Sequence, residues 1–527
     1  MRVRFPARAS GPAGALGPAS GPAAAGGRWR APGAVVAGAL PALAFPAPSL
    51  WWLAYVALVP WLLLVRSADS PRRAAREAWL GGAGFLLAVH HWLLPSLHVF
   101  ILLLAALLGL LWVPWGLLVH RLLGGRPGPG RVAAALVLVP AGWLLAELVR
   151  SWEYLGGPWG LLGASQWQVP AALRLASVGG VWLVGLLLVA VNTALAAVLA
   201  LPRARLAGLA GLTGCAAVTA GVWWWAPQPR AAGTARIAIV QPGVVDGPGS
   251  VRRRLDREEE LTRSLAGRGV DLVVWGESSV GTDLGADPAL RARLSALSRT
   301  VGADLLVNVD ARRSDRPGIF KSSVLVGPDG PTGDRYDKMR LVPFGEYVPA
   351  RSLLGWATSV GKAATEDRRR GDRQVVTRLP SGRGAGLRIG PLVCFETAFP
   401  DMSRHLAADG ARVLVAQSST SSFQHGWAPG QHASLAALRA AETWRPMVHA
   451  TLTGVSAVAD AHGRTVGPRL GTGTSAAAVY DVPLASGTSP YVRAGDWAVY
   501  AALAALVLWC GAEGARALVR RRASPRR

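Results

Sequence analysis

Long runs of apolar residues between positions 33 and 226, with one more near 496–515, constrain this chain more than any other feature. A bilayer core about 30 Å thick is crossed by roughly 20 consecutive apolar residues of helix. The runs approach that length and recur, so the sequence predicts a multi-span α-helical membrane domain. Residues 234–490 have instead the mixed polarity of a soluble domain.

The apolar runs divide into eight candidate spans, and the first of them is the weakest. Pro41 and Pro46 interrupt it, so it also resembles the core of a signal peptide. The residues before it, 1–32, are rich in Gly, Ala and Pro and are expected to be disordered. We therefore expect seven helices within 33–226, an eighth at the C-terminal end and a basic tail. The spans are 33–48, 49–66, 78–95, 98–119, 131–150, 175–201, 205–226 and 496–515, and the tail is 516–527.

The net charge of +25 is placed where it predicts orientation in the membrane. Basic residues gather before the first span, in alternate loops and in the tail, for example at Arg30, Arg72, Arg121, Arg203 and Arg521. Loops rich in Arg and Lys stay on the cytoplasmic side. We therefore expect both termini in the cytoplasm and residues 227–495 outside. No nucleic-acid-binding motif accompanies the charge, so no nucleic-acid partner is expected.

Three ionisable residues stand near the outer end of the fifth span. Glu147, Arg150 and Glu153 are spaced three apart, which places them on one face of a helix. A structural salt bridge is one interpretation. The other is a head-group site, because charged groups at membrane depth often mark functional positions.

The soluble region alternates strand-like and helix-like segments, which predicts an α/β layered sandwich. Short apolar segments flanked by turn residues predict the strands, and amphipathic segments between them predict the helices. The expected strands are 235–241, 271–275, 304–309, 322–326, 387–393 and 412–416, and the expected helices are 251–266, 287–300, 400–409 and 432–443.

Candidate catalytic residues stand where such strands end or in the loops beside them. Glu277 follows one strand, Cys394 follows another, and Lys338 lies in a loop rich in turn residues. A carboxylate can accept the proton of a thiol, and an ammonium group can stabilise a thiolate and an oxyanion. Each residue taken singly also has a structural interpretation, as a buried small side chain, a helix cap or a solvated charge.

Three motifs resemble the nitrilase, or carbon–nitrogen hydrolase, superfamily: WGES at 275–278, YDKMRLVPFGEYVP at 336–349 and CFETAFPD at 394–401. The pattern K-x-x-L-V-P-F-G-E-x-V-P, with spans on both sides of the domain, is similar to the apolipoprotein N-acyltransferase family. GGPWGLLGASQ at 156–166 resembles an outer loop of that family. The resemblance implies an extracytoplasmic nitrilase-like αββα sandwich and a location in the bacterial cytoplasmic (inner) membrane.

The resemblance also implies roles and a reaction. Glu277 would be the general base, Lys338 the stabiliser of the oxyanion, Cys394 the nucleophile and Glu346 a supporting carboxylate. Cys394 would take a fatty acyl chain from a phospholipid. The resulting thioester would acylate the α-amino group of the S-diacylglyceryl-cysteine of a lipoprotein. No cofactor and no metal ion are implied.

Further residues are expected around this triad. Phe395 and Glu396, directly after the nucleophile, would shape the pocket. The segment 418–430 is small and polar around Phe423 and Trp427, which is typical of a mobile functional loop. We expect these two aromatic residues to form a lid or lipid-entry rim that faces the membrane.

The chain departs from the family pattern at three places. Many members carry S-N-D-x-W-F where this chain has 418–423, T-N-N-G where it has 451–454, and an aromatic–Asn pair where it has Phe320 and Lys321. Two alternatives stay open. One is a membrane-tethered amidase with the same triad, against which the membrane spans argue. The other is a non-catalytic membrane scaffold, which the altered stretches 418–423 and 451–454 keep open.

The arginine pattern generates a test of orientation. Cysteines introduced near residues 70 and 524 should be shielded from a membrane-impermeant thiol reagent in intact cells. A cysteine near residue 250 should react. Labelling near 70 without labelling near 250 would invert the topology.

Overall fold

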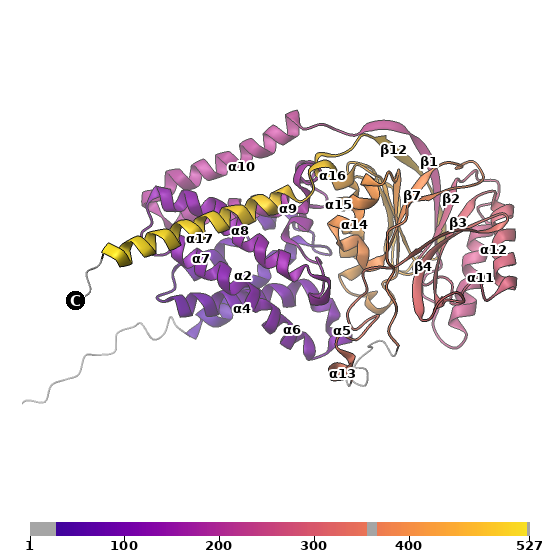
Figure 1. The fold of residues 1–527 in the computed structure, drawn as a ribbon, viewed down its shortest axis with the longest axis horizontal. Coiled ribbons are helices and arrows are strands. Elements are labelled where there is room, and N and C mark those ends of the chain that lie inside the picture. Colours follow the sequence, from indigo (N-terminus) through magenta and orange to yellow (C-terminus); the bar gives the residue numbers. More distant parts are fainter. Residues whose placement is uncertain (1–27, 356–365, 524–527) are drawn as a thin grey trace, which may run out of the picture.

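The computed structural model describes residues 28–355 and 366–523. The disorder expected for residues 1–27 and the end of the basic tail, 524–527, lie outside the described residues. A helical part and an α/β part lie end to end (Figure 1). The helical part contains residues 30–225 together with the C-terminal helix, α17 (Trp497–Ala523).

Six helices among the described residues are long and apolar enough to cross a membrane. Four of the six begin at a proline, namely Pro71, Pro129, Pro170 and Pro202, which fits the preference of proline for the first position of a helix. Two of the six contain a short interruption: α4 (Pro71–His90) continues into α5 (Leu94–Leu97), and α6 (Phe100–Gly109) continues into α7 (Val113–Leu123). The others are α8 (Pro129–Arg150), α9 (Pro170–Ala200), α10 (Arg205–Trp225), preceded by a short 3₁₀ turn, and α17.

The first two expected spans form shorter helices, which differs from the expectation of eight full spans. The chain folds as α2 (Arg30–Ala39) with a 3₁₀ turn to Ala44, then as a 3₁₀ turn (Trp51–Tyr55) followed by α3 (Val59–Arg66). Helix α2 also begins inside the segment 1–32 that was expected to be disordered. The prolines explain the interruption, because proline cannot donate a backbone hydrogen bond within a helix.

The helical part packs around buried tryptophans and close helix contacts. Trp61, Trp115 and Trp143 are buried, and the ring centroids of Trp61 and Trp115 lie 4.8 Å apart. Helices α2 and α4 approach closely because Gly38 faces the backbone of Gly81. Membrane helices commonly associate through such small residues, because lipid offers little hydrophobic drive between helices.

The α/β part is a sandwich of two six-stranded sheets. One sheet has the order β12-β1-β2-β3-β4-β5, and the other has the order β11-β10-β9-β8-β7-β6. Apolar side chains from β1, β2, β7 and β8 meet between the sheets. The first sheet contains β1 (Arg230–Gln241), β2 (Leu272–Trp275), β3 (Asp304–Arg312), β4 (Ile319–Gly327), β5 (Gly330–Asp337) and β12 (Ala476–Ser486). The second contains β6 (Thr377–Arg378), β7 (Arg388–Val393), β8 (Val413–Ser418), β9 (Met447–Thr451), β10 (Ser456–Ala459) and β11 (Thr465–Leu470).

Helices cover both outer faces of the sandwich, so the predicted αββα layering is present. Helices α11 (Ser250–Arg263) and α12 (Pro288–Val301) lie on the side away from the membrane helices (Figure 1). Helices α14 (Pro400–Ala408) and α15 (Ala428–Thr443) lie between the second sheet and the helical part. Helix α15 contacts both α9 and the strands β9 and β10. It is buried along almost its whole length and joins the two parts.

The six expected strands and four expected helices are present, with ends shifted by up to five residues. Six further strands, namely β5, β6 and β9–β12, were not expected. Their sequences explain why: β5 reads GPTGDRYD and β12 is rich in alanine, so neither shows clear alternation of apolar and polar residues.

Two glycines of α2 allow a matched test of the close contact between α2 and α4. A Cβ atom at Gly38 would overlap the carbonyl group of Gly81, whereas a Cβ atom at Gly33 would meet nothing within 4 Å. Gly38→Ala should therefore lower the free energy of unfolding by about 1–3 kcal/mol through overpacking. Gly33→Ala should be neutral or slightly stabilising, because alanine favours helix by about 1 kcal/mol over glycine. Thermal unfolding in detergent measures both, and equal melting temperatures for the two variants would contradict the proposed contact.

Candidate functional site

The two sheets bring their strand ends together where Glu277 and Cys394 lie. Glu277 follows β2 of the first sheet, and Cys394 follows β7 of the second. The backbone N–H of Glu277 donates to the carbonyl oxygen of Ser418 at the end of β8, over 3.1 Å. Gly276 allows this approach, because a Cβ atom there would overlap the backbone of Leu452. The sheet packing itself therefore places the carboxylate beside the second sheet.

Lys338 lies directly after β5 and is fully buried. Its Nζ atom lies 3.1 Å from Oε1 of Glu277 and 2.7 Å from Oε1 of Glu346. The second oxygen of Glu346 accepts the backbone N–H of Val342, over 2.8 Å, which fixes the carboxylate within its own turn. The structure thus brings together three of the residues that the sequence motifs singled out.

A second lysine completes this cluster, and the sequence motifs did not assign it a role. Lys321, on β4, places its Nζ atom 2.8 Å from Oε1 of Glu277 and 3.0 Å from Oε1 of Glu346. It is the residue that departs from the aromatic–Asn pair of the family. Its position in the strand segment IFKSSVLV was the available signal, because a lysine inside a buried strand needs a charge partner.

The four charges hold one another ionised in spite of their burial. Burial by itself raises the pKa of the Glu277 carboxyl, but the ammonium groups of Lys321 and Lys338 outweigh it and lower that pKa to about 2. Burial lowers the pKa of Lys321, and the carboxylates of Glu277 and Glu346 more than reverse this and raise it well above its ordinary value. At neutral pH, Glu277 is therefore a carboxylate and both lysines are cations.

Cys394 begins a short 3₁₀ turn (Cys394–Ala398) with a backbone φ of 52°. A non-glycine residue in this left-handed region is strained, and such strain is common at functional positions. Its Sγ atom lies 3.9 Å from the carbonyl oxygen of Ser419. Removal of water raises the pKa of the thiol to about 12, with the Glu277 carboxylate acting in the same direction. The resting site therefore pairs a neutral thiol with a charged carboxylate.

His432, on α15, holds the backbone of Cys394. Its Nε2 atom donates to the carbonyl oxygen of Cys394 over 2.9 Å. Burial lowers the pKa of His432 to about 4, so the imidazole is neutral near pH 7. The ring also lies against Trp159, with centroids 5.3 Å apart, in the membrane-part segment GGPWG. The sequence motifs did not reveal His432 as part of the site.

Glu396 and Phe395, which the sequence led us to expect around the pocket, are both buried. Oε1 of Glu396 accepts from the Tyr336 hydroxyl and from the backbone N–H of Met339, each over 2.7 Å. Oε2 accepts from the backbone N–H of Val393. Glu396 therefore ties the Lys338 loop to the Cys394 turn. Phe395 is buried and packs edge-on against Phe399, with centroids 5.0 Å apart.

Phe423 and Trp427 lie against the end of α4 and the turn that follows it. The ring of Phe423 meets that of Trp92 edge-on at 4.8 Å, and the ring of Trp427 meets that of His91 at 4.4 Å. Both aromatic residues are half-buried. The loop after β8 is therefore in contact with the membrane part, while its role as a lid remains a prediction.

The three ionisable residues near the end of α8 do not form one salt-bridged face. The Glu147 carboxylate accepts the backbone N–H of Leu162, and Arg150 donates to the carbonyl oxygen of Gly157. Glu153 instead binds two arginines of the α/β part, Arg340 at 2.8 Å and Arg370. The helix ends at Arg150, so Glu153 points away from the other two and joins the two parts of the molecule.

Two family models match separate parts of this chain. Residues 37–194 match the family model described as apolipoprotein N-acyltransferase N-terminal domain, and residues 236–489 match the one described as carbon–nitrogen hydrolase. A solved Nesterenkonia amidase of the nitrilase superfamily is 20% identical, with a TM-score of 0.34 over 49% of this chain and 93% of the amidase.

Two relatives named apolipoprotein N-acyltransferase match nearly end to end. The protein from Geobacter metallireducens is 30% identical over 89% of this chain and 92% of its own length. The protein from Azotobacter vinelandii is 32% identical over 93% of this chain and 95% of its own length. The chain belongs to the apolipoprotein N-acyltransferase family.

Proposed function

We propose that this chain moves a fatty acyl group from a phospholipid, through a thioester on Cys394, to the α-amino group of a lipoprotein's diacylglyceryl-cysteine. The observation that carries the proposal is the buried cluster of Glu277, Lys338 and Glu346 at the strand ends beside a single strained cysteine. The contact of this site with the membrane part, through Trp159 and Glu153, supports lipid-anchored substrates. A domain that acts on soluble amides has no need of that contact.

In the first half-reaction the Sγ atom of Cys394 attacks the ester carbonyl carbon of the phospholipid. The Glu277 carboxylate takes the thiol proton as the carbon–sulfur bond forms. The Lys338 ammonium group stabilises the oxyanion of the tetrahedral intermediate. The ester carbon–oxygen bond then breaks, and the alkoxide of the lysophospholipid leaves with the proton from Glu277.

In the second half-reaction a neutral α-amino group attacks the thioester carbonyl carbon. The amine proton passes to Glu277, and the same ammonium group stabilises the oxyanion. The carbon–sulfur bond breaks, and the released thiolate recovers its proton from Glu277. An amide, the original thiol and the original carboxylate result, so the cycle closes without a cofactor.

Lys321 would act as a positioning residue in this cycle. Its contacts with both carboxylates hold Glu277 and Glu346 at a separation that leaves Lys338 between them. Its charge also favours the thiolate form of Cys394, as does that of Lys338. Lys321 would thus contact both carboxylates from a position where the family pattern has an asparagine.

For the membrane arrangement we propose helices within 33–226, a catalytic domain over 234–490 and a C-terminal anchor at 496–515. The arginine-rich loops support a cytoplasmic location for both termini. The catalytic domain would then lie on the extracytoplasmic side of a bacterial inner membrane. Phe423 and Trp427 would border the entry of the acyl chain.

The thioester can be tested directly. Incubation with phospholipid alone should add one fatty-acyl mass to the peptide that contains Cys394, and neutral hydroxylamine should remove it. Cys394→Ala and Glu277→Gln should not load, because one lacks the nucleophile and the other the base. Lys338→Ala should slow loading by about 10²-fold, a typical loss for one oxyanion contact. Mass spectrometry of this peptide measures acyl loading in the unsubstituted protein and in the three variants.

Two outcomes would favour the alternatives. If Cys394→Ala still restores N-acylated lipoproteins in cells that lack the native protein, the scaffold interpretation replaces the catalytic one. If the loaded enzyme is discharged by water as fast as by a diacylglyceryl peptide with a free amine, the protein is a membrane-tethered amidase or hydrolase.

The role of Lys321 predicts a change in pH dependence. Glu277 must be ionised to act as a base, and two ammonium groups hold its pKa at about 2. Lys321→Asn removes one of these ammonium groups, so the pKa of Glu277 rises. As the pH is lowered, the loading rate of Lys321→Asn should therefore begin to fall at a higher pH than the rate of the unsubstituted protein. Lys321→Arg keeps the charge and is the matched control. Single-turnover loading between about pH 4.5 and pH 8 measures the profiles, and identical profiles for Lys321→Asn and the unsubstituted protein would rule out the role.

A further inference from the structure

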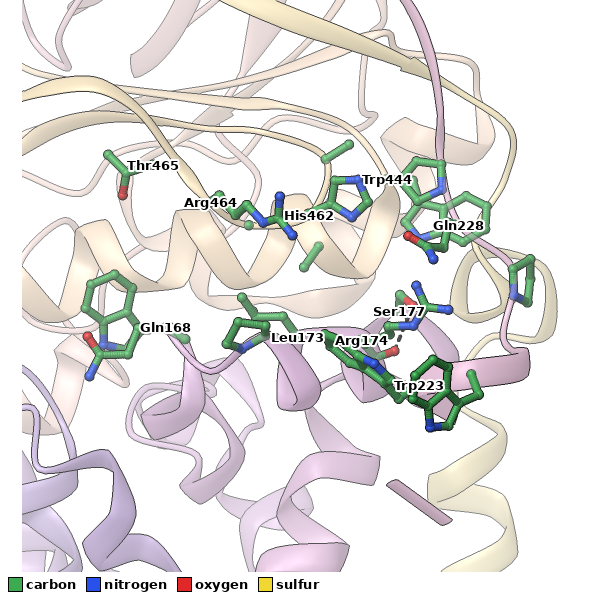
Figure 2. A pocket seen from close by; sticks show the side chains of 18 of the residues that line it. Gln168, Leu173, Arg174, Ser177, Trp223, Gln228, Trp444, His462, Arg464 and Thr465 are labelled. Atoms are coloured by element: carbon green, nitrogen blue, oxygen red, sulfur yellow. Dashed lines mark hydrogen bonds between the residues drawn. The ribbon is translucent and has the colours of Figure 1, made fainter. Parts of the chain in front are cut away.

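A pocket of about 570 Å³ lies where the membrane part meets the α/β part, and it contains none of the triad residues (Figure 2). Its lower side comes from α9 and the end of α10, with Arg174 and Trp223 (Figure 2). Its upper side comes from the end of α15 and the loop before β11, with Trp444, His462 and Arg464. The pocket therefore opens at the level where membrane helices end.

Three arginines line this pocket, and the lining includes no carboxylate. Among residues 28–355 and 366–523, Arg174, Arg464 and Arg469 form no ion pair with Asp or Glu within 4.0 Å, which leaves their charges uncompensated at that range. The Oδ1 atom of Asp460, in the same loop, accepts the backbone N–H groups of His462 and Arg464. An excess of positive charge therefore remains in the pocket.

The guanidinium groups are oriented by their other contacts. Arg174 donates to the carbonyl oxygens of Val222 and Ala226 at the end of α10. The guanidinium of Arg469 lies 4.8 Å from the centroid of the Trp167 ring. The pKa of His462 is lowered, by burial first and also by the charges of Arg464 and Arg174, with Asp460 opposing. Arg174, Arg464 and this imidazole all line the same pocket.

Aromatic residues at the edge of the pocket place it at a membrane surface. Trp223 and Trp224 at the end of α10 are 41% and 74% exposed. Exposed tryptophans at the end of a membrane helix are typical of the lipid head-group level. Arginine pairs well with phosphate oxygens, because its planar group offers several donors in a fixed arrangement.

We propose that this pocket binds the phosphate-bearing head group of an anionic phospholipid, from the leaflet on the side of the catalytic domain. The phosphate would lie between Arg464, Arg469 and Arg174, and the acyl chains would follow α10 past Trp223 and Trp224. The bound lipid is not consumed, so the site goes beyond the proposed acyl transfer.

Helix α15 separates the pocket from the nucleophile. His432 binds the Cys394 carbonyl group near the start of this helix, and Ala441 lines the pocket near its end. Nine residues of helix span about 14 Å at 1.5 Å per residue. A lipid held here therefore has its head group away from Cys394. The expected effect of such a lipid is to hold the catalytic domain against the bilayer surface.

The test uses full-length Cys394→Ala protein, which cannot react, so that failure of the proposed acyl transfer leaves the result interpretable. Native mass spectrometry of the delipidated protein would count bound phosphatidylglycerol and, in a second arm, phosphatidylcholine. We expect phosphatidylglycerol to bind, and Arg464→Gln with Arg469→Gln to weaken that binding by at least about tenfold, the size of one lost charge-assisted contact.

The control pair is Arg252→Gln with Arg291→Gln, which makes the same charge change on exposed residues of α11 and α12, away from the membrane part. It should bind phosphatidylglycerol like the parent. Glycerol 3-phosphate and inorganic phosphate form the remaining arms, and neither should compete at millimolar concentration if the acyl chains contribute. Equal lipid binding by both double variants, equal binding of the two lipids, or full competition by phosphate alone would each overturn the proposal.

Discussion

The buried contact between the Lys338 ammonium group and the carboxylates of Glu277 and Glu346 sets the requirements for the rest of the α/β part. An isolated charge in this position would cost several kcal/mol, so each charge has to meet a partner at hydrogen-bond distance. That in turn requires the ends of β2 and β5, and the loop that follows β5, to be held within fractions of an ångström. Gly276 and Glu396 tie this cluster to the second sheet, Gly276 through close backbone approach and Glu396 through three hydrogen bonds.

The membrane part also contacts the residues around Cys394 and Lys338. Trp159 donates to Gln431 over 2.7 Å and lies beside His432, which binds the Cys394 carbonyl group. At the other edge, Glu153 binds Arg340, two residues after Lys338. The segment between α8 and α9 thus touches both the Cys394 turn and the Lys338 loop. The proposed reaction between two lipid-anchored molecules would require this continuity, because the reacting carbonyl would have to reach the thiol without leaving the membrane surface.

The charge cluster also shows why the departures from the family pattern need not disable the site. Lys321 stands where many members carry an asparagine, yet it contacts the same two carboxylates that Lys338 contacts. In the other departing stretches, Ser418 bonds to His449 and Thr451 bonds to Gln241. Ser418 and Thr451 therefore find hydrogen-bond partners among a different set of side chains.

By itself, the sequence determined the division into apolar spans and a mixed α/β domain, because hydrophobic length and periodicity are local properties. It also determined Glu277, Lys338 and Cys394 as candidates, because each stands in a recognisable local motif. The tertiary structure alone decided that Lys321 and His432 join them, that Glu396 ties two loops together, and that Glu153 binds the α/β part. The same is true of the arginine-lined pocket. Those features depend on contacts between residues far apart in the chain, and no local pattern encodes which distant partner will satisfy a buried charge.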